Sequence, residues 1–149
     1  MTLRRATPAD SAFLAEVQEA ASLAGLAHVY PPERYPFPND AVRRRWEVFT
    51  SAGGWAVRSD HGFVAVSGCW LEALYVLPQA WGTGHADDLH DAAVEELRRL
   101  AVERARLWVL EENARARRFY ERHGWRADGT SRVVEFPPNP TDLGYTLAI

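Results

Sequence analysis

Hydrophobic positions recur at helical spacing in the first third of the chain. Thr7 can cap a helix that starts at residue 8, and apolar residues follow it with helical periodicity. Asn39 or Asp40 can cap a second helix, which a pair of glycines would end. Residues 28–38, between the two helices, are rich in proline and aromatic side chains, so we expect an ordered loop there.

The middle of the chain changes to short strand-like runs separated by tight turns. Residues 55–60, 63–67 and 69–77 form such runs, and the short turns between them predict an antiparallel meander. A Gly-x-Gly turn and an amphipathic helix come next. The chain then continues with a strand at 105–112, a helix at 113–124, and closing strands at 133–136 and 143–149. We therefore predict one α/β domain over residues 1–149, with a mixed, mainly antiparallel central sheet flanked by helices.

The composition excludes several kinds of chemistry. All 17 basic residues are arginine, so a Walker-type phosphate lysine and a lysine nucleophile are impossible. The net charge of -3 argues against a nucleic acid partner. A single cysteine and five histidines without ligand spacing predict no metal site. The arginine clusters at 43–45, 98–99 and 115–118 are typical of solvated helix faces.

Neither end of the chain nor its middle carries an obvious membrane or export signal. No apolar run approaches the roughly 20 residues that span a bilayer. The N-terminal residues 1–17 contain arginines but no apolar block with a cleavage site. We therefore expect a cytoplasmic protein without a membrane partner, either a monomer or a homodimer.

The turn between the strand at 69–77 and the following helix contains Gly82-Thr83-Gly84. Glycine at such a junction lets backbone N–H groups approach a ligand, and a helix start favours an anion. A plain structural turn is the alternative, and this stretch alone does not decide between them. A dinucleotide fingerprint would need a third glycine where Asp87 stands, so that motif is absent.

A second block, Asn113-Ala114-Arg115-Ala116-Arg117-Arg118-Phe119-Tyr120, follows the next strand. It places an asparagine at the strand end and a tyrosine about two turns into a helix. Together with Leu74-Tyr75-Val76-Leu77-Pro78 and the glycine turn, this block resembles the GCN5-related N-acetyltransferase (GNAT) superfamily. The resemblance covers nearly the whole chain and is weakest between residues 25 and 40.

The resemblance implies acetyl transfer from acetyl-CoA, as co-substrate, to an amine. It assigns the acetyl carbonyl to backbone N–H groups of Leu74, Tyr75 and Val76, with Val76 as the expected donor. It implies that Asn113 holds the pantetheine arm and that Tyr120 protonates the leaving thiolate, which suits a phenol with an ordinary pKa near 10. It places the pyrophosphate on backbone N–H groups of the turn and first helical residues, here Gly82, Thr83, Gly84, His85, Ala86 and Asp87.

The chain departs from the family pattern around this turn. Trp81 stands where the family carries glutamine or arginine, and His85 stands where an aliphatic residue is common. Asp87 and Asp88 add negative charge beside the expected pyrophosphate. Helix phase predicts that both carboxylates point outward, yet we expect them to weaken the electrostatic attraction for CoA.

The general base and the acceptor are less well indicated. Glu72, on the strand at 69–77, is the candidate base, with Glu111 and Glu112 as alternatives. We expect Tyr30, Tyr35 and Trp70 to line a pocket for a small, partly apolar amine.

Two other functions fit the same residues. The departures around Trp81 also fit a non-catalytic CoA-binding sensor or partner-binding module. The glycine turn alone would fit a nucleotide-binding regulator.

Overall fold

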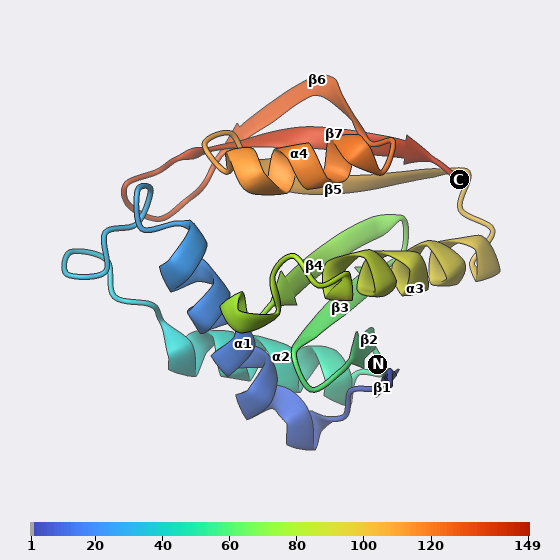
Figure 1. Cartoon of the computed structure of the whole chain (residues 1–149), viewed down its shortest axis with the longest axis horizontal. Coiled ribbons are helices and arrows are strands. Elements are labelled where there is room, and N and C mark those ends of the chain that lie inside the picture. Colours follow the sequence, from blue (N-terminus) through green and yellow to red (C-terminus); the bar gives the residue numbers. More distant parts are fainter. Residues whose placement is uncertain (1) are drawn as a thin grey trace.

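The chain forms one central sheet, seen in a computed structural model that describes residues 2–149 (Figure 1). The sheet has seven strands in the order β1-β2-β3-β4-β5-β7-β6. The strands are β1 (Arg4–Arg5), β2 (Trp55–Arg58), β3 (Gly62–Ser67), β4 (Trp70–Val76), β5 (Arg104–Leu110), β6 (Arg126–Val133) and β7 (Thr141–Ala148). All neighbouring pairs are antiparallel except β4 and β5, which are parallel. The predicted mixed, mainly antiparallel sheet is confirmed.

Four α-helices and two 3-10 turns complete the fold. The helices are α1 (Ser11–Gly25), α2 (Asn39–Ser51), α3 (His85–Arg99) and α4 (Ala114–Arg122). The 3-10 turns are η1 (Pro8–Asp10), which leads directly into α1, and η2 (Pro78–Ala80), which follows β4. The helices predicted after Thr7, near Asn39, after the glycine turn and after Asn113 are therefore present. The predicted cap of α2 by Asn39 or Asp40 is wrong, because α2 begins at Asn39 with Pro38 as its N-cap residue, and the Asn39 side chain donates to Glu19 instead.

One predicted strand is in the wrong place. We expected a closing strand at 133–136, but β6 ends at Val133. Its residues are exposed along their whole length, so no alternation of buried and exposed positions marks it. A register shift between Ala127 and Ser131, around Gly129 at a φ of 85°, interrupts the pairing with β7. An irregular edge strand with no buried face gives little sequence signal.

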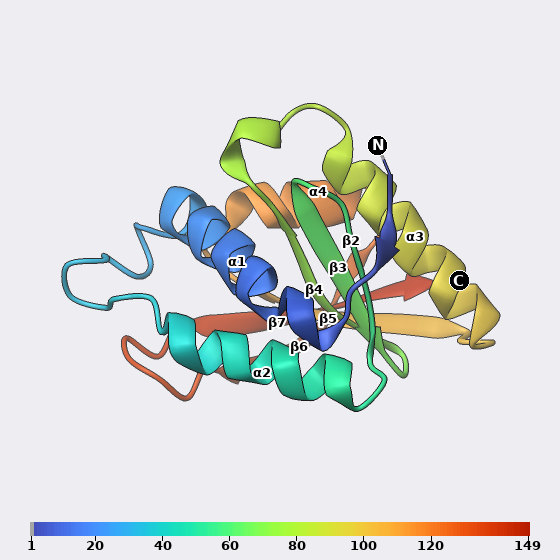
Figure 2. The same ribbon diagram turned by 90° about the horizontal axis from the view of Figure 1, so that it is seen from below.

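The sheet separates two hydrophobic cores, and Figure 2 shows from below the helices and strands that enclose them. On one face Leu14 and Val17 of α1 and Trp46 of α2 pack against Phe63 and Ala65 of β3. On the other face α3 and α4 cover the sheet, with a core that includes Leu89, Leu97, Leu107, Tyr120 and Trp125. Alternate residues of β3 contribute to opposite cores, which is why the strand is apolar from Phe63 to Val66.

No helix among residues 2–149 is long and apolar enough to cross a membrane.

Candidate acetyl donor site

The sheet opens between β4 and β5. These strands pair only where Trp70 lies beside Arg106, at the start of β4, and they separate beyond that point. In Figure 1, β5 and β7 run with α4 on one side of the opening, and β3 and β4 run with α3 on the other. The edge of β4 that faces β5 therefore has backbone groups without a strand partner.

The free groups on β4 belong to alternate residues. The N–H of Leu77 donates to the carbonyl of His61 on the β3 side, at 2.7 Å. Backbone groups along a strand alternate between its two edges, so Tyr75 also points to β3, whereas Leu74 and Val76 point into the opening. The indole N–H of Trp81 donates to the Val76 carbonyl at 2.8 Å, which agrees with this orientation. The Val76 N–H points the same way as that carbonyl.

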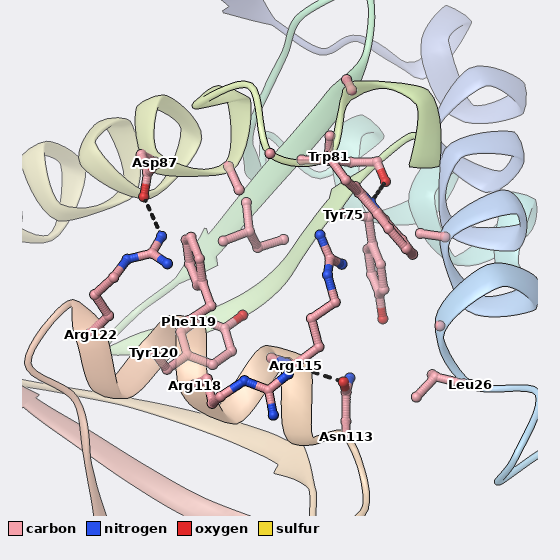
Figure 3. A pocket seen from close by; sticks show the side chains of 18 of the residues that line it. Leu26, Tyr75, Trp81, Asp87, Asn113, Arg115, Arg118, Phe119, Tyr120 and Arg122 are labelled. Carbon is pink, nitrogen blue, oxygen red and sulfur yellow. Dashed lines mark hydrogen bonds and ion pairs between the residues drawn. The ribbon is translucent and has the colours of Figure 1, made fainter.

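A cavity of about 600 Å³ lies at this opening (Figure 3). Its walls come from α1, the end of β4, the glycine turn with the start of α3, and α4. The residues that line it are Ala21, Ser22, Gly25, Leu26, Leu74, Tyr75, Val76, Ala80, Trp81, Gly82, Gly84, Ala86, Asp87, Asn113, Arg115, Ala116, Arg118, Phe119, Tyr120 and Arg122. The structure thus brings together most of the residues predicted for the cofactor.

The glycine turn forms one end of the cavity. Gly82 and Gly84 have φ values of 76° and 88°, in the left-handed region that other residues rarely adopt. These φ values are the reason that the turn needs glycine at both positions. A Cβ at either glycine would meet nothing within 4 Å, so the space beside the turn is open. Gly84 caps α3, and no side chain accepts from the first-turn N–H groups. These groups and the helix dipole favour an anion at this end.

Asp87 behaves differently from the prediction. It lines the cavity instead of pointing away from it, while Asp88 is exposed. Its carboxylate accepts from His123 Nε2 at 2.7 Å and from Arg122 Nη2 at 2.9 Å. The hydrogen bond from His123 is the largest cause that lowers the pKa of Asp87. The hydrogen bond from Arg122 and the charge of Arg122 lower it further. We expected the negative charge of Asp87 to oppose an anion, but this carboxylate is already paired with Arg122 of α4 and with His123, the C-cap residue of α4.

Arginines of α4 give the cavity its positive charge. Arg115, Arg118 and Arg122 all line it, and Asp87 is the only carboxylate among the described lining residues. The interpretation of residues 115–118 as a solvated face missed this, because exposed arginines can also border a cavity. Their spacing of three and four residues places them on one face of the helix, which is the signal that could have found them.

Asn113 and Tyr120 lie on the same wall as these arginines. Asn113 caps α4, where its side-chain oxygen accepts from the N–H of Ala116 at 3.2 Å, so its amide N–H₂ is not used by the cap. Tyr120 is buried and packs against Phe119 and Trp125. Within residues 2–149 its hydroxyl forms no hydrogen bond, although it borders the cavity. Burial, with a smaller effect of Tyr75, raises the pKa of Tyr120.

The other predicted site residues lie outside the cavity lining. Glu72 is exposed and forms an ion pair with Arg45 at 3.7 Å. Thr83 and His85 hydrogen-bond to each other beside the glycine turn, and Glu111 and Glu112 are exposed. The three predicted acceptor aromatics have other neighbours: Tyr30 stacks on Phe136, Trp70 stacks on Trp108, and Tyr35 lies near Arg34.

One histidine cluster resembles a metal site but fits one poorly. His90, Asp91 and His123 offer ligand atoms within 4.8 Å of one another. Trp125 donates its indole N–H to Nε2 of His90 at 2.9 Å, so neutral His90 carries its proton on Nδ1. That Nδ1 faces Asp91 at 3.9 Å and offers an N–H where a metal needs a lone pair. The absence of a metal stays a prediction.

Residues 4–125 match the model of the acetyltransferase (GNAT) family. The chain belongs to the GNAT family.

This GNAT protein is also similar to individual relatives. Over 81 residues it is 37% identical to a mycothiol acetyltransferase of Beutenbergia cavernae, a match that covers 48% of this chain and 27% of that protein. The match thus spans only about a quarter of the length of that curated relative.

Solved structures share the fold over almost the whole chain. A GCN5-related N-acetyltransferase of Rhodopseudomonas palustris has a TM-score of 0.79 and 19% identity, covering 99% of this chain and 95% of that one. The PaiA N-acetyltransferase of Thermoplasma acidophilum, solved with coenzyme A, has a TM-score of 0.74 and 16% identity, covering 99% and 98%. At these identities the likeness concerns the fold, and the predicted GNAT-like fold is confirmed.

Proposed function

We propose that this GNAT protein is an N-acetyltransferase that moves the acetyl group of acetyl-CoA directly to a primary amine of a small molecule. One observation carries the proposal. The unpaired edge of β4 at Leu74 and Val76, and the Tyr120 hydroxyl, which has no hydrogen-bond partner in residues 2–149, border one cavity. A thioester needs a donor for its carbonyl oxygen and an acid for its sulfur, and these groups supply both.

Three parts of the cavity fit three parts of acetyl-CoA. The first-turn N–H groups of α3, capped by Gly84, suit the pyrophosphate. The Asn113 amide and the free β4 edge suit the amides of the pantetheine arm, as a strand suits its neighbour. The Val76 N–H is the proposed donor to the acetyl carbonyl oxygen. A relative of the same fold was solved with coenzyme A, which supports this assignment.

Acetyl-CoA supplies an activated carbonyl carbon that an amine nitrogen can attack, with loss of the sulfur as thiolate. Tyr120 gives its phenolic proton to that sulfur. Tyr120 is protonated at neutral pH, since its ordinary pKa near 10 is raised further by burial, so it holds the proton that the departing thiolate takes up. The amine proton passes to water, because the only carboxylate lining the described cavity, Asp87, is already paired. Glu72 is the alternative base.

The acceptor is proposed to be small because the cavity wall formed by α1 is uncharged. It consists of Ala21, Ser22 and Gly25 of α1 and the C-cap residue Leu26, which offer no carboxylate to recognise a basic protein tail. The relative from Beutenbergia cavernae carries the name mycothiol acetyltransferase, which also points to a small-molecule acceptor.

Tyr120→Phe tests the acid role. It should lower kcat roughly a hundredfold or more, with the Kd for acetyl-CoA little changed, since the ring remains and only the proton donor is lost. Tyr145→Phe, which removes a tyrosine hydroxyl outside the cavity lining, is the matched control. Full activity of Tyr120→Phe across the pH range would refute the acid role. Glu72→Gln should keep its kcat if water is the base.

A non-catalytic CoA-binding module is the second candidate, and one observation favours it. None of the cavity residues in the described chain is an unpaired carboxylate that could serve as a base. Calorimetry with acetyl-CoA, followed by a transfer assay on a panel of amines, separates the two functions. Tight binding without transfer to any amine would favour the module. Thermal stabilisation by ATP or NAD, and none by CoA, would favour a nucleotide regulator over both.

A further inference from the structure

Trp81 is held rigidly at the entrance to the glycine turn. Its indole N–H donates to the Val76 carbonyl at 2.8 Å, and its ring is partly buried against the core beneath α3 and α4. The same ring reaches α1, where a Cβ on Gly25 would lie 3.6 Å from its edge. Contacts with β4, α1 and the core together fix the plane of the indole directly before Gly82.

Arg115 lies over this fixed ring. Its guanidinium carbon is 3.6 Å from the centre of the Trp81 ring, and both side chains border the cavity (Figure 3). An indole face attracts a guanidinium through its π electrons and leaves the N–H donors in the guanidinium plane unused.

The donors of Arg115 have no protein acceptor. Among the hydrogen bonds and ion pairs of residues 2–149, none involves Arg115 or Arg118, whereas Arg117 and Arg122 bond to Tyr145 and Asp87. Arg118 also lines the cavity, but of these two arginines only Arg115 lies over an aromatic ring. An arginine that is fixed in direction, borders a cavity and has unused donors suits an anionic ligand that the fold does not supply.

We infer that Arg115, positioned by Trp81, is the cation that binds the pyrophosphate of the cofactor. The inference rests on the proposed function and deepens it. Trp81 acts as a positioning residue, and the glycine turn, which begins at the next residue, supplies the N–H groups on the other side of the same anion.

Calorimetry with three ligands tests where Arg115 acts. CoA and dephospho-CoA both contain the pyrophosphate, dephospho-CoA lacks the 3′-phosphate, and pantetheine contains no phosphate. Arg115→Gln should bind CoA and dephospho-CoA roughly ten- to a hundredfold more weakly and should leave pantetheine binding within about twofold. Arg44→Gln, an exposed arginine on α2 outside the cavity lining, should change none of these affinities.

The outcomes separate this inference from the proposed function. If the unmodified protein binds no CoA, the proposed function fails. If it binds CoA and Arg115→Gln binds equally well, only the inference fails. A loss that appears with CoA and disappears with dephospho-CoA would place Arg115 at the 3′-phosphate and overturn the inference.

Variants of Trp81 test the positioning role. Trp81→Phe keeps an aromatic face without the indole N–H and should keep most of the affinity for dephospho-CoA. Trp81→Leu removes the face and should lose about as much affinity as Arg115→Gln, and the double variant should lose little more. Additive losses in the double variant would overturn the coupling. Melting curves verify that each variant folds. If Trp81→Leu does not fold, the affinities of Trp81→Phe and Arg115→Gln for dephospho-CoA are compared instead.

Discussion

His90 is a histidine that the fold keeps neutral, and replacing it should remove a pH dependence from the stability of the protein. Its side chain on α3 is 3% exposed. Nε2 accepts from Trp125, and Nδ1 has no hydrogen-bond partner in the described chain. Burial, followed by the charge of His123, lowers the pKa of His90 from 6.5 to about 4, and the opposing effects of Asp91 and Asp87 are smaller.

The direction of the effect follows from where each state takes up its proton. In the unfolded chain His90 binds a proton near pH 6.5, whereas in the folded protein it does so only near pH 4. The free energy of unfolding therefore has its full contribution from neutral His90 above pH 6.5 and loses it as the pH falls toward 4. At about 1.4 kcal/mol for each pH unit, acidification from pH 7 to pH 5 should cost about 2 kcal/mol.

Urea unfolding followed by tryptophan fluorescence, at pH 7 and at pH 5, measures this difference. His90→Gln is the perturbation, because glutamine fits a helix and can place an oxygen near the position of Nε2 to accept from Trp125. The variant should lose much less stability between the two pH values than the unmodified protein. His61→Gln, which replaces an exposed histidine, should leave the pH dependence unchanged. Parallel pH curves for the unmodified protein and His90→Gln would refute the argument that burial keeps this imidazole neutral.

Three further predictions concern the turn, a buried ion pair and a helix cap. Gly84→Ala should cost about 1–2 kcal/mol of stability, because alanine is strained at a φ of 88°, and should weaken CoA binding; an unchanged melting temperature would argue against the left-handed turn. Asp10→Asn should cost about 3 kcal/mol, since the buried carboxylate accepts from both Arg4 and Arg58, and urea midpoints would measure it. Asn113→Ala should lose about 1 kcal/mol with the helix cap, whereas Asn113→Asp should keep the cap, so weaker CoA binding by the aspartate variant would isolate the role of the amide N–H₂.

The sequence was sufficient for most elements because their signals are local. Thr7 and Asn113 mark helix starts through their polar side chains, and Gly84 marks a turn because the lack of a Cβ allows its positive φ. The strand β6 was misplaced because no face of it is buried and its pairing is interrupted near Gly129. Such a segment shows no alternation of apolar and polar residues from which a strand could be predicted.

The site was harder to predict, because it depends on which distant elements become neighbours. That Asp87 would meet Arg122 and His123 requires α3 and α4 to lie side by side, and no spacing along the chain contains that fact. The contact of Arg115 with Trp81 has the same origin. Glu72 lies on the strand that borders the opening, yet its side chain pairs with Arg45 of α2 and is not part of the cavity lining, a contact between distant elements that strand position alone does not reveal. Residues of the blocks around Gly84 and Tyr120 line one cavity, and their resemblance to a family could indicate this because the family pattern includes tertiary information, whereas their roles stay predictions.

The separation of β4 from β5 also bears on how the protein avoids aggregation. An unpaired strand edge is normally a template on which another polypeptide can add a strand. Here the bare edge at Leu74 and Val76 lies inside a cavity with walls from α1 and α4, and it is not on the outside of the sheet. A polypeptide strand carries side chains on both faces, and these side chains would collide with the walls from α1 and α4. A narrow chain without such side chains would not collide with them. The walls of the cavity should therefore exclude other polypeptides from the unpaired edge of β4. The protein can then keep an unpaired strand edge in the middle of its sheet without aggregating through it.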